Sequence, residues 1–283
     1  MGITYMSQTL SQLFNIKAVF IDVDGTAVLS EERNREAIEH VARAGGHDIQ
    51  PEDWATLAGA GDEVIWERIV DLNAEFKNSY PTADDFESAC VDGYNARKDE
   101  VRVNQAVLDA VTSFIDAGID TAAVSNSLHD VVKTNLDVAG YDRSLLRFVL
   151  TKTEVREKGL KPKPDPAPYV EALRMLNEIR ARDDQAPVNA SECLILEDSL
   201  TGVRAALKAG MRVLHIRDDS AQLPAAETQR LEDKFNGHYY SCDLNTVPII
   251  CQALQNGIDY PKNNPAVVKF PQNQQTSFKP TGS

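Results

Sequence analysis

The segment Lys17-Ala-Val-Phe-Ile-Asp22-Val-Asp-Gly-Thr26 joins an apolar run directly to a turn rich in carboxylates. Four further short apolar runs lie at residues 120–124, 147–150, 193–196 and 212–216. Unbroken apolar runs of this length are typical of strands buried on both faces, as in a parallel sheet. The five runs therefore predict the strands of such a sheet.

Helical patterns separate these runs. Residues 104–117, 130–139 and 199–209 carry apolar side chains at spacings of three and four, and Gly118, Gly140 or Gly210 follows each pattern. A glycine just beyond the last turn is a common helix terminator. The alternation of strands and helices predicts an α/β fold, a doubly wound Rossmann-like parallel sheet.

Two segments depart from this alternation. Residues 30–100 show helical periodicity without a convincing strand, which predicts an all-helical domain inserted after the first strand. Residues 258–283 are rich in Pro, Asn and Gln, a composition typical of a disordered tail. The α/β core is therefore expected to comprise residues 1–29 and 101–257.

The composition of the chain limits the kinds of partner that it can bind. The 283 residues include 43 Asp and Glu but only 29 Lys and Arg, a formal net charge of −14. Such an acidic chain is poorly suited to nucleic acid or to an anionic membrane surface. No apolar run is long enough to span a membrane, and the first residues do not resemble a signal peptide. Four unpaired cysteines agree with a cytoplasmic protein, which we expect to be a monomer or a homodimer.

Polar side chains follow the predicted strands. In open α/β sheets, ligands bind beyond the carboxyl ends of the strands, so the residues there are expected to converge. They are Asp22, Asp24, Gly25 and Thr26 after the first run, Ser125 and Asn126 after the second, and Glu197 and Asp198 after the fourth, with a Lys-Pro-rich loop at residues 160–166.

This set of groups predicts phosphoryl chemistry. Several carboxylates stay ionised together only with a cation between them, and hard oxygen ligands suit Mg²⁺. Asp22 would attack phosphorus to form an aspartyl-phosphate, and Asp24 would act as general acid and then as general base. Ser125 and a lysine would hold the transferring oxygens. Taken singly, Asp22–Gly25 also fits a plain turn, Glu197–Ser199 a helix N-cap, and Lys161 and Lys163 solvated side chains.

The motifs DVDGT, VSNS, LKPKPDPAPY and LEDSLTGVRAALKAGM resemble those of the haloacid dehalogenase superfamily. The resemblance covers residues 17–30 and 101–217, and the segment between them resembles the helical C1 cap of the β-phosphoglucomutase and phosphoglycolate phosphatase branch. It implies that Asp22 is the nucleophile and a Mg²⁺ ligand and that Asp24 binds the metal through its carbonyl. It further implies that Asp198 binds Mg²⁺ and that Glu197 binds or orients it.

The same resemblance implies the phosphate-binding residues. Ser125, with Asn126 beside it, would hold the phosphate together with a lysine. The family pattern Lys-Pro-x-Pro-Asp falls on residues 161–165, which selects Lys161 rather than Lys163.

Within this branch, a Mg²⁺-dependent phosphatase acting on a small phosphorylated metabolite is favoured over a β-phosphoglucomutase-like mutase. The histidine that such mutases carry is replaced by Asn34, and Asp62 stands where they present an arginine to a second phosphate. A non-catalytic binding module is the third hypothesis.

The cap suggests what the substrate is like. Gly59 and Gly61 would let the cap backbone approach a substrate. Residues 30–100 carry 18 Asp and Glu against 7 Lys and Arg, which favours a phosphomonoester with a neutral or cationic leaving portion.

Overall fold

A six-stranded parallel sheet forms the centre of the molecule. The computed structural model describes residues 16–57, 61–97, 101–217, 230–231, 234–235, 238–243 and 247. The sheet order is β5-β4-β1-β6-β7-β8, and all five strand pairs are parallel. The strands are β1 (Ala18–Ile21), β4 (Asp120–Val124), β5 (Val149–Leu150), β6 (Cys193–Glu197), β7 (Arg212–Arg217) and β8 (Tyr239–Asp243). The predicted α/β fold with a parallel sheet is confirmed, and β8 is a strand that the sequence analysis did not predict.

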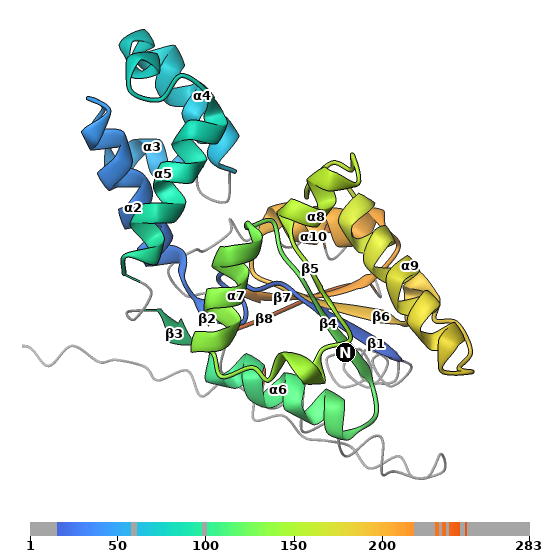
Figure 1. Cartoon of the computed structure of the whole chain (residues 1–283). Coiled ribbons are helices and arrows are strands. Elements are labelled where there is room, and N and C mark those ends of the chain that lie inside the picture. The colour runs from blue at the N-terminus through green and yellow to red at the C-terminus, as the bar shows by residue number, and fades with distance from the viewer. Residues whose placement is uncertain are drawn as a thin grey trace, which may run out of the picture.

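Helices cover both faces of the sheet (Figure 1). Side chains of β1 alternate between two apolar clusters: Val19 and Ile21 pack with α6 and α7, whereas Ala18 and Phe20 pack with α8, α9 and α10. The helices are α6 (Gln105–Asp116), α7 (His129–Val138), α8 (Lys152–Glu157), α9 (Ala167–Arg182) and α10 (Leu200–Lys208). The glycines that follow α6, α7 and α10 have the positive φ angles expected of helix terminators.

A helical insertion (residues 31–95) follows the first strand and its loop. Its elements are α2 (Glu31–Ala44), α3 (Pro51–Leu57), α4 (Asp62–Leu72), the 3-10 helix η1 (Ala74–Asn78) and α5 (Ala83–Asn95). They surround an apolar cluster of their own, which includes Ile38, Ile65, Phe76 and Phe86. A short antiparallel pair, β2 (Val28–Leu29) with β3 (Arg102–Val103), joins the segments that enter and leave the insertion. The predicted tail at residues 258–283 lies outside the described residues.

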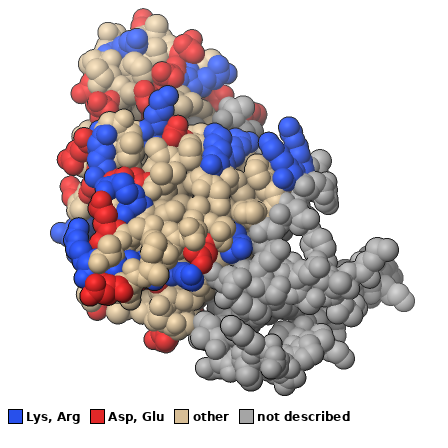
Figure 2. Space-filling view, turned by 90° about the vertical axis from the view of Figure 1, so that its right-hand side faces the viewer, with Lys and Arg blue, Asp and Glu red and all other residues tan. Residues whose placement is uncertain are grey.

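Charged side chains of both signs are interspersed on the described surface seen in Figure 2. Among the described residues, no helix combines the length and apolar character needed to cross a membrane.

Candidate active site

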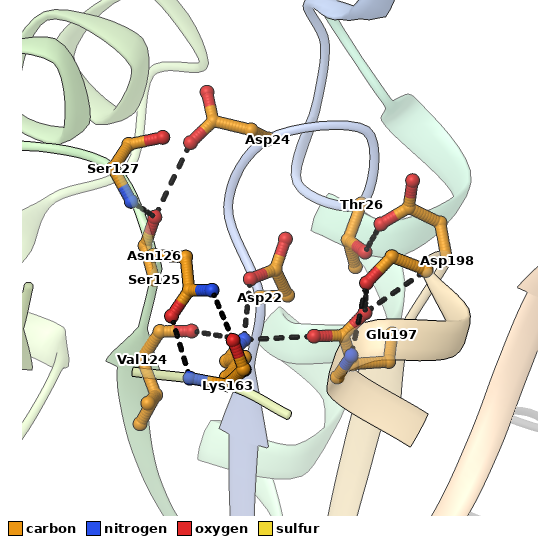
Figure 3. Close-up of polar contacts among 12 residues, drawn as sticks. Asp22, Asp24, Thr26, Val124, Ser125, Asn126, Ser127, Lys163, Glu197 and Asp198 are labelled. Carbon is orange, nitrogen blue, oxygen red and sulfur yellow. Dashed lines mark hydrogen bonds and ion pairs between the residues drawn. The ribbon is translucent and has the colours of Figure 1, made fainter. Parts of the chain in front are cut away.

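The candidate active site lies where three central strands end (Figure 3). The register pairs Ile21, the last residue of β1, with Ala123 of β4 on one side and with Leu196 of β6 on the other. Asp22 therefore stands between the residues that end β4 and β6. This is the convergence that the sequence predicts for residues beyond the carboxyl ends of parallel strands.

Lys163 lies at the centre of the carboxylate cluster. Its Nζ donates to Oδ1 of Asp22 at 2.6 Å, to Oε1 of Glu197 at 2.7 Å and to the Val124 carbonyl at 2.9 Å. These three acceptors match the three protons of an ammonium group. Burial lowers the pKa of Lys163, but the carboxylates of Asp22 and Glu197 raise that pKa by more, so it lies well above its usual range. Lys163 is therefore a fixed positive charge beside Asp22.

The structure thus corrects the expectation that Lys161 is the site lysine. Lys161 is exposed, whereas Lys163 is only 4% exposed. The Asn126 amide explains why Lys163 is the lysine at this position. The amide accepts from the Lys163 backbone N–H at 3.0 Å and donates to the Lys163 carbonyl at 3.1 Å. Asn126, expected beside the phosphate, uses its amide to position the lysine. The motif Lys-Pro-x-Pro occurs twice in overlapping registers, at 161–164 and 163–166.

Three carboxylates form a possible metal site. Each of Asp22, Glu197 and Asp198 offers one oxygen, and these oxygens all lie within 4.8 Å of one another. Burial raises the pKa of both Asp22 and Asp198 well above the usual range, and the negative charge of Glu197 contributes to both shifts. A bound divalent cation would favour the ionised forms of these groups, and carboxylate oxygens are the ligands that Mg²⁺ prefers. The donor set therefore fits Mg²⁺.

Glu197 is already held by protein donors. Its Oε1 accepts from Lys163 and from the Tyr169 hydroxyl at 3.3 Å, and its Oε2 accepts from the backbone N–H and the hydroxyl of Ser199, both at 2.9 Å. Four donors occupy the lone-pair positions of a carboxylate. Of the two roles expected for Glu197, this arrangement favours orientation of the site over direct metal binding.

A glycine makes room for Glu197. A Cβ atom on Gly202, in α10, would lie 1.5 Å from Oε1 of Glu197. Real side chains cannot approach so closely, and the carboxylate would have to move. Gly202 was not predicted as a site residue, because a glycine within a helical pattern does not by itself indicate what it packs against.

Gly25 and Thr26 shape the loop after β1. Gly25 has a φ of 81°, and a Cβ there would lie 2.1 Å from Oδ2 of Asp198. The Thr26 hydroxyl donates to Oδ1 of Asp198 at 2.8 Å, and Thr26 is fully buried. These two residues, expected to bind phosphate, connect the loop after β1 to the end of β6.

Asp24 lies on the other side of this loop. Its Oδ2 accepts from the Ser125 hydroxyl at 3.2 Å, and Ser125 Oγ itself accepts from the Ser127 N–H at 2.9 Å. Its Oδ1 accepts from the Ser30 hydroxyl at 3.3 Å and from Nδ2 of Asn135. Ser125 is therefore next to Asp24, as expected. Asn135 was not among the predicted site residues, although it is a polar residue on the apolar face of a predicted helix.

The two expected cap glycines lie apart from these contacts. Gly59 lies outside the described residues. Gly61 is exposed at the start of α4, and a Cβ there would meet nothing within 4 Å. The insertion contacts the α/β part elsewhere: Glu87 of α5 forms ion pairs with Lys152 and Arg156 of α8.

Comparisons with known proteins agree with this architecture. The family model of haloacid dehalogenase-like hydrolases matches residues 16–210. CbbY from Rhodobacter sphaeroides, in complex with phosphate, is similar with a TM-score of 0.63 and 22% identity, over 82% of this chain and 95% of that one. A putative β-phosphoglucomutase from Thermotoga maritima has a TM-score of 0.59 and 16% identity, over 84% and 99% of the two chains.

A curated relative from Arabidopsis thaliana is much longer. The chain is 26% identical over 204 residues to Protein SUPPRESSOR OF QUENCHING 1, chloroplastic, a match that covers 71% of this chain. The match spans only 18% of that protein.

Proposed function

Because this chain belongs to the haloacid dehalogenase-like hydrolase family, we propose that it is a Mg²⁺-dependent phosphatase that hydrolyses small phosphomonoesters through an aspartyl-phosphate on Asp22. The observation that carries the proposal is the position of Asp22. Its carboxylate contacts the Lys163 ammonium, belongs to the acidic cluster with Asp198, and lies two residues from a second carboxylate, Asp24.

In the first half-reaction, a carboxylate oxygen of Asp22 attacks phosphorus, and the bond to the leaving oxygen breaks. Asp24 donates its proton to that oxygen, so that the product leaves as an alcohol. Ser125 would hold a transferring oxygen, and the positive charge of Lys163 would offset the negative charge of the phosphoryl group. Mg²⁺, held by Asp22, Asp198 and the Asp24 carbonyl, would neutralise the negative charge shared by the phosphoryl group and Asp22.

In the second half-reaction, water attacks the phosphorus of the aspartyl-phosphate. Asp24 now takes a proton from this water while the bond between phosphorus and Asp22 breaks, which releases inorganic phosphate and restores both carboxyl groups. The step needs no further reactant.

We propose that residues 30–100 form the cap of this enzyme and that residues 1–29 and 101–257 form its core. The cap carries most of the chain's excess negative charge, so the substrate should have a neutral or cationic leaving portion. A clear preference for bisphosphates would contradict this. We also expect a cytoplasmic monomer or homodimer.

The test uses the full chain with p-nitrophenyl phosphate and a panel of phosphorylated metabolites, with Mg²⁺ and with EDTA. Asp22→Asn should lower kcat/KM by at least roughly 10³-fold. Acid quenching during turnover should trap a phosphorylated protein whose intact mass is increased, and Asp22→Asn should abolish this species. Asp116→Asn, which changes an exposed aspartate of α6, is the matched control and should retain activity.

Three outcomes would overturn the proposal. Full activity of Asp22→Asn would exclude the covalent route. Conversion of β-glucose 1-phosphate to glucose 6-phosphate would instead identify a mutase. Failure to hydrolyse any phosphomonoester would favour a binding module.

A further inference from the structure

The two carboxylate oxygens of Asp24 have different surroundings. Oδ1 accepts from Asn135 Nδ2 and from the Ser30 hydroxyl, whereas Oδ2 accepts from the Ser125 hydroxyl. Ser125 directly follows β4 and is proposed to hold the phosphoryl group. Oδ2 is therefore the Asp24 oxygen that faces Ser125 (Figure 3).

Asn135 belongs to α7 and is fully buried, and its apolar neighbours in that helix, Val131, Val132 and Leu136, are buried too. An amide in such a position must find partners for both of its polar atoms. Its Nδ2 donates to Asp24, and its Oδ1 accepts from the Tyr94 hydroxyl at 2.8 Å. Both ends of the amide are thereby satisfied.

Asp24 and Tyr94 hold opposite ends of this amide. Oδ1 of Asp24 is an acceptor, so the group of Asn135 that faces it is the NH₂. The amide oxygen is left to accept from the Tyr94 hydroxyl. Tyr94 belongs to α5 of the insertion, so residues of both parts of the molecule contribute to this arrangement.

We propose that Asn135, held in place by Tyr94, is a positioning residue that holds Oδ1 of Asp24 and so makes Oδ2 the oxygen that transfers the proton. The inference rests on the proposed phosphatase function. During formation of the aspartyl-phosphate, the proton on Oδ2 moves to the leaving oxygen as the bond between that oxygen and phosphorus breaks. Without Asn135, the carboxyl group would rotate and present its proton less often.

The test compares two substrates of similar shape. p-Nitrophenyl phosphate releases a stable phenolate and needs little protonation, whereas benzyl phosphate releases an alkoxide that must be protonated as it leaves. The value of kcat/KM reports the steps up to loss of the alcohol, so it isolates the first half-reaction from the hydrolysis of the aspartyl-phosphate.

Asn135→Leu should lower kcat/KM for benzyl phosphate by roughly 10- to 100-fold, but for p-nitrophenyl phosphate by no more than about 3-fold. Tyr94→Phe retains the ring and should lower the benzyl phosphate value by about 3- to 10-fold, with the same selectivity. Inhibition by inorganic phosphate should be unchanged in both variants, because neither residue contacts Ser125 or Lys163 in any hydrogen bond described in the structure.

Tyr141→Phe is the matched control. Tyr141 is buried in the same apolar cluster as Tyr94, and its hydroxyl has no hydrogen-bond partner among the described residues. This variant should leave both substrates unaffected. If Asn135→Leu does not fold, Tyr94→Phe and its control carry the test by themselves.

Equal losses on both substrates, or no loss, would overturn the positioning role and leave the phosphatase proposal intact. If the unaltered protein hydrolyses neither substrate with Mg²⁺, the proposed function is wrong and this inference is overturned with it.

Discussion

The Lys163 ammonium lies 2.6 Å from Oδ1 of Asp22, although 141 positions separate the two residues in the chain. Both side chains are buried, and the pair is completed by Glu197 at the end of β6. A buried charge is costly unless it is paired, so the positions of these three residues depend on one another. The carboxylate proposed as nucleophile is thus part of a buried ionic group whose members come from three separate segments of the chain.

Replacement of Lys163 should disrupt both stability and activity. Lys163→Met leaves Asp22 and Glu197 buried without their cation, so we expect the free energy of unfolding to fall by about 3–5 kcal/mol. We expect kcat/KM for p-nitrophenyl phosphate to fall by roughly 10²-fold or more. Lys161→Met, two residues away and exposed, should change neither quantity appreciably. Both quantities are measured, by denaturant unfolding and steady-state kinetics. Large losses for Lys161→Met with little change for Lys163→Met would identify Lys161 as the site lysine instead.

Gly202→Ala should be destabilising. The new Cβ would meet Oε1 of Glu197 at 1.5 Å and force the carboxylate away from Lys163. We expect the free energy of unfolding to fall by about 1–3 kcal/mol, together with a loss of activity. Gly93→Ala, in the middle of α5, is the matched control, because its Cβ would meet its nearest neighbour, Ala37, at 3.7 Å. That variant should gain roughly 0.5–1 kcal/mol. Equal thermal midpoints for the two variants would contradict the close approach at Gly202.

Asp62 should make stability depend on pH. Burial raises the pKa of Asp62 from 3.8 to about 6, with Glu87 adding to the rise and Lys152 and Arg156 opposing it. The folded protein then holds a proton that the unfolded chain releases, so Asp62 lowers stability progressively as the pH rises from about 4 to about 6.

Asp62→Asn removes this penalty. Relative to the unaltered protein, its free energy of unfolding should be higher by about 1–2 kcal/mol at pH 7, and the difference should vanish near pH 4. Asp71→Asn changes an exposed aspartate of the same helix and should show no such trend. The free energies of unfolding are measured by urea unfolding across this pH range. A difference between Asp62→Asn and the unaltered protein that stays constant with pH would show that the pKa of Asp62 is not raised.

Magnesium should stabilise the folded protein through the carboxylate cluster. At about ten times its dissociation constant, a bound ion contributes roughly 1.4 kcal/mol, which corresponds to about 3–6 °C in the thermal midpoint for a chain of this size. The effect should grow with pH, because the raised pKa values of Asp22 and Asp198 mean that protons compete with the ion. Asp198→Asn should lose this stabilisation and Asp116→Asn should keep it. An unchanged midpoint for the unaltered protein would argue against the metal site.

Much of the fold could be predicted because its signals are local. The run at residues 120–124 is a strand with those bounds, and the runs before Asp22 and Glu197 are the central strands. Elements of two residues, such as β2 and β3, are too short to produce a pattern. The helix α9 was not predicted, although Tyr169, Ala172 and Leu176 lie at helical spacing in the sequence.

The amino-acid sequence by itself determined that Asp22, Glu197 and Asp198 meet, because they follow apolar runs, and parallel strands end at one edge of a sheet. Only the tertiary structure decided which lysine joins them, since Lys-Pro-x-Pro begins at both Lys161 and Lys163, and the hydrogen bonds of Asn126 go to Lys163. It also decided which groups lie next to Asn135, Tyr94 and Gly202. Each of these acts through a contact between segments, and the spacing of residues along a chain does not specify such contacts.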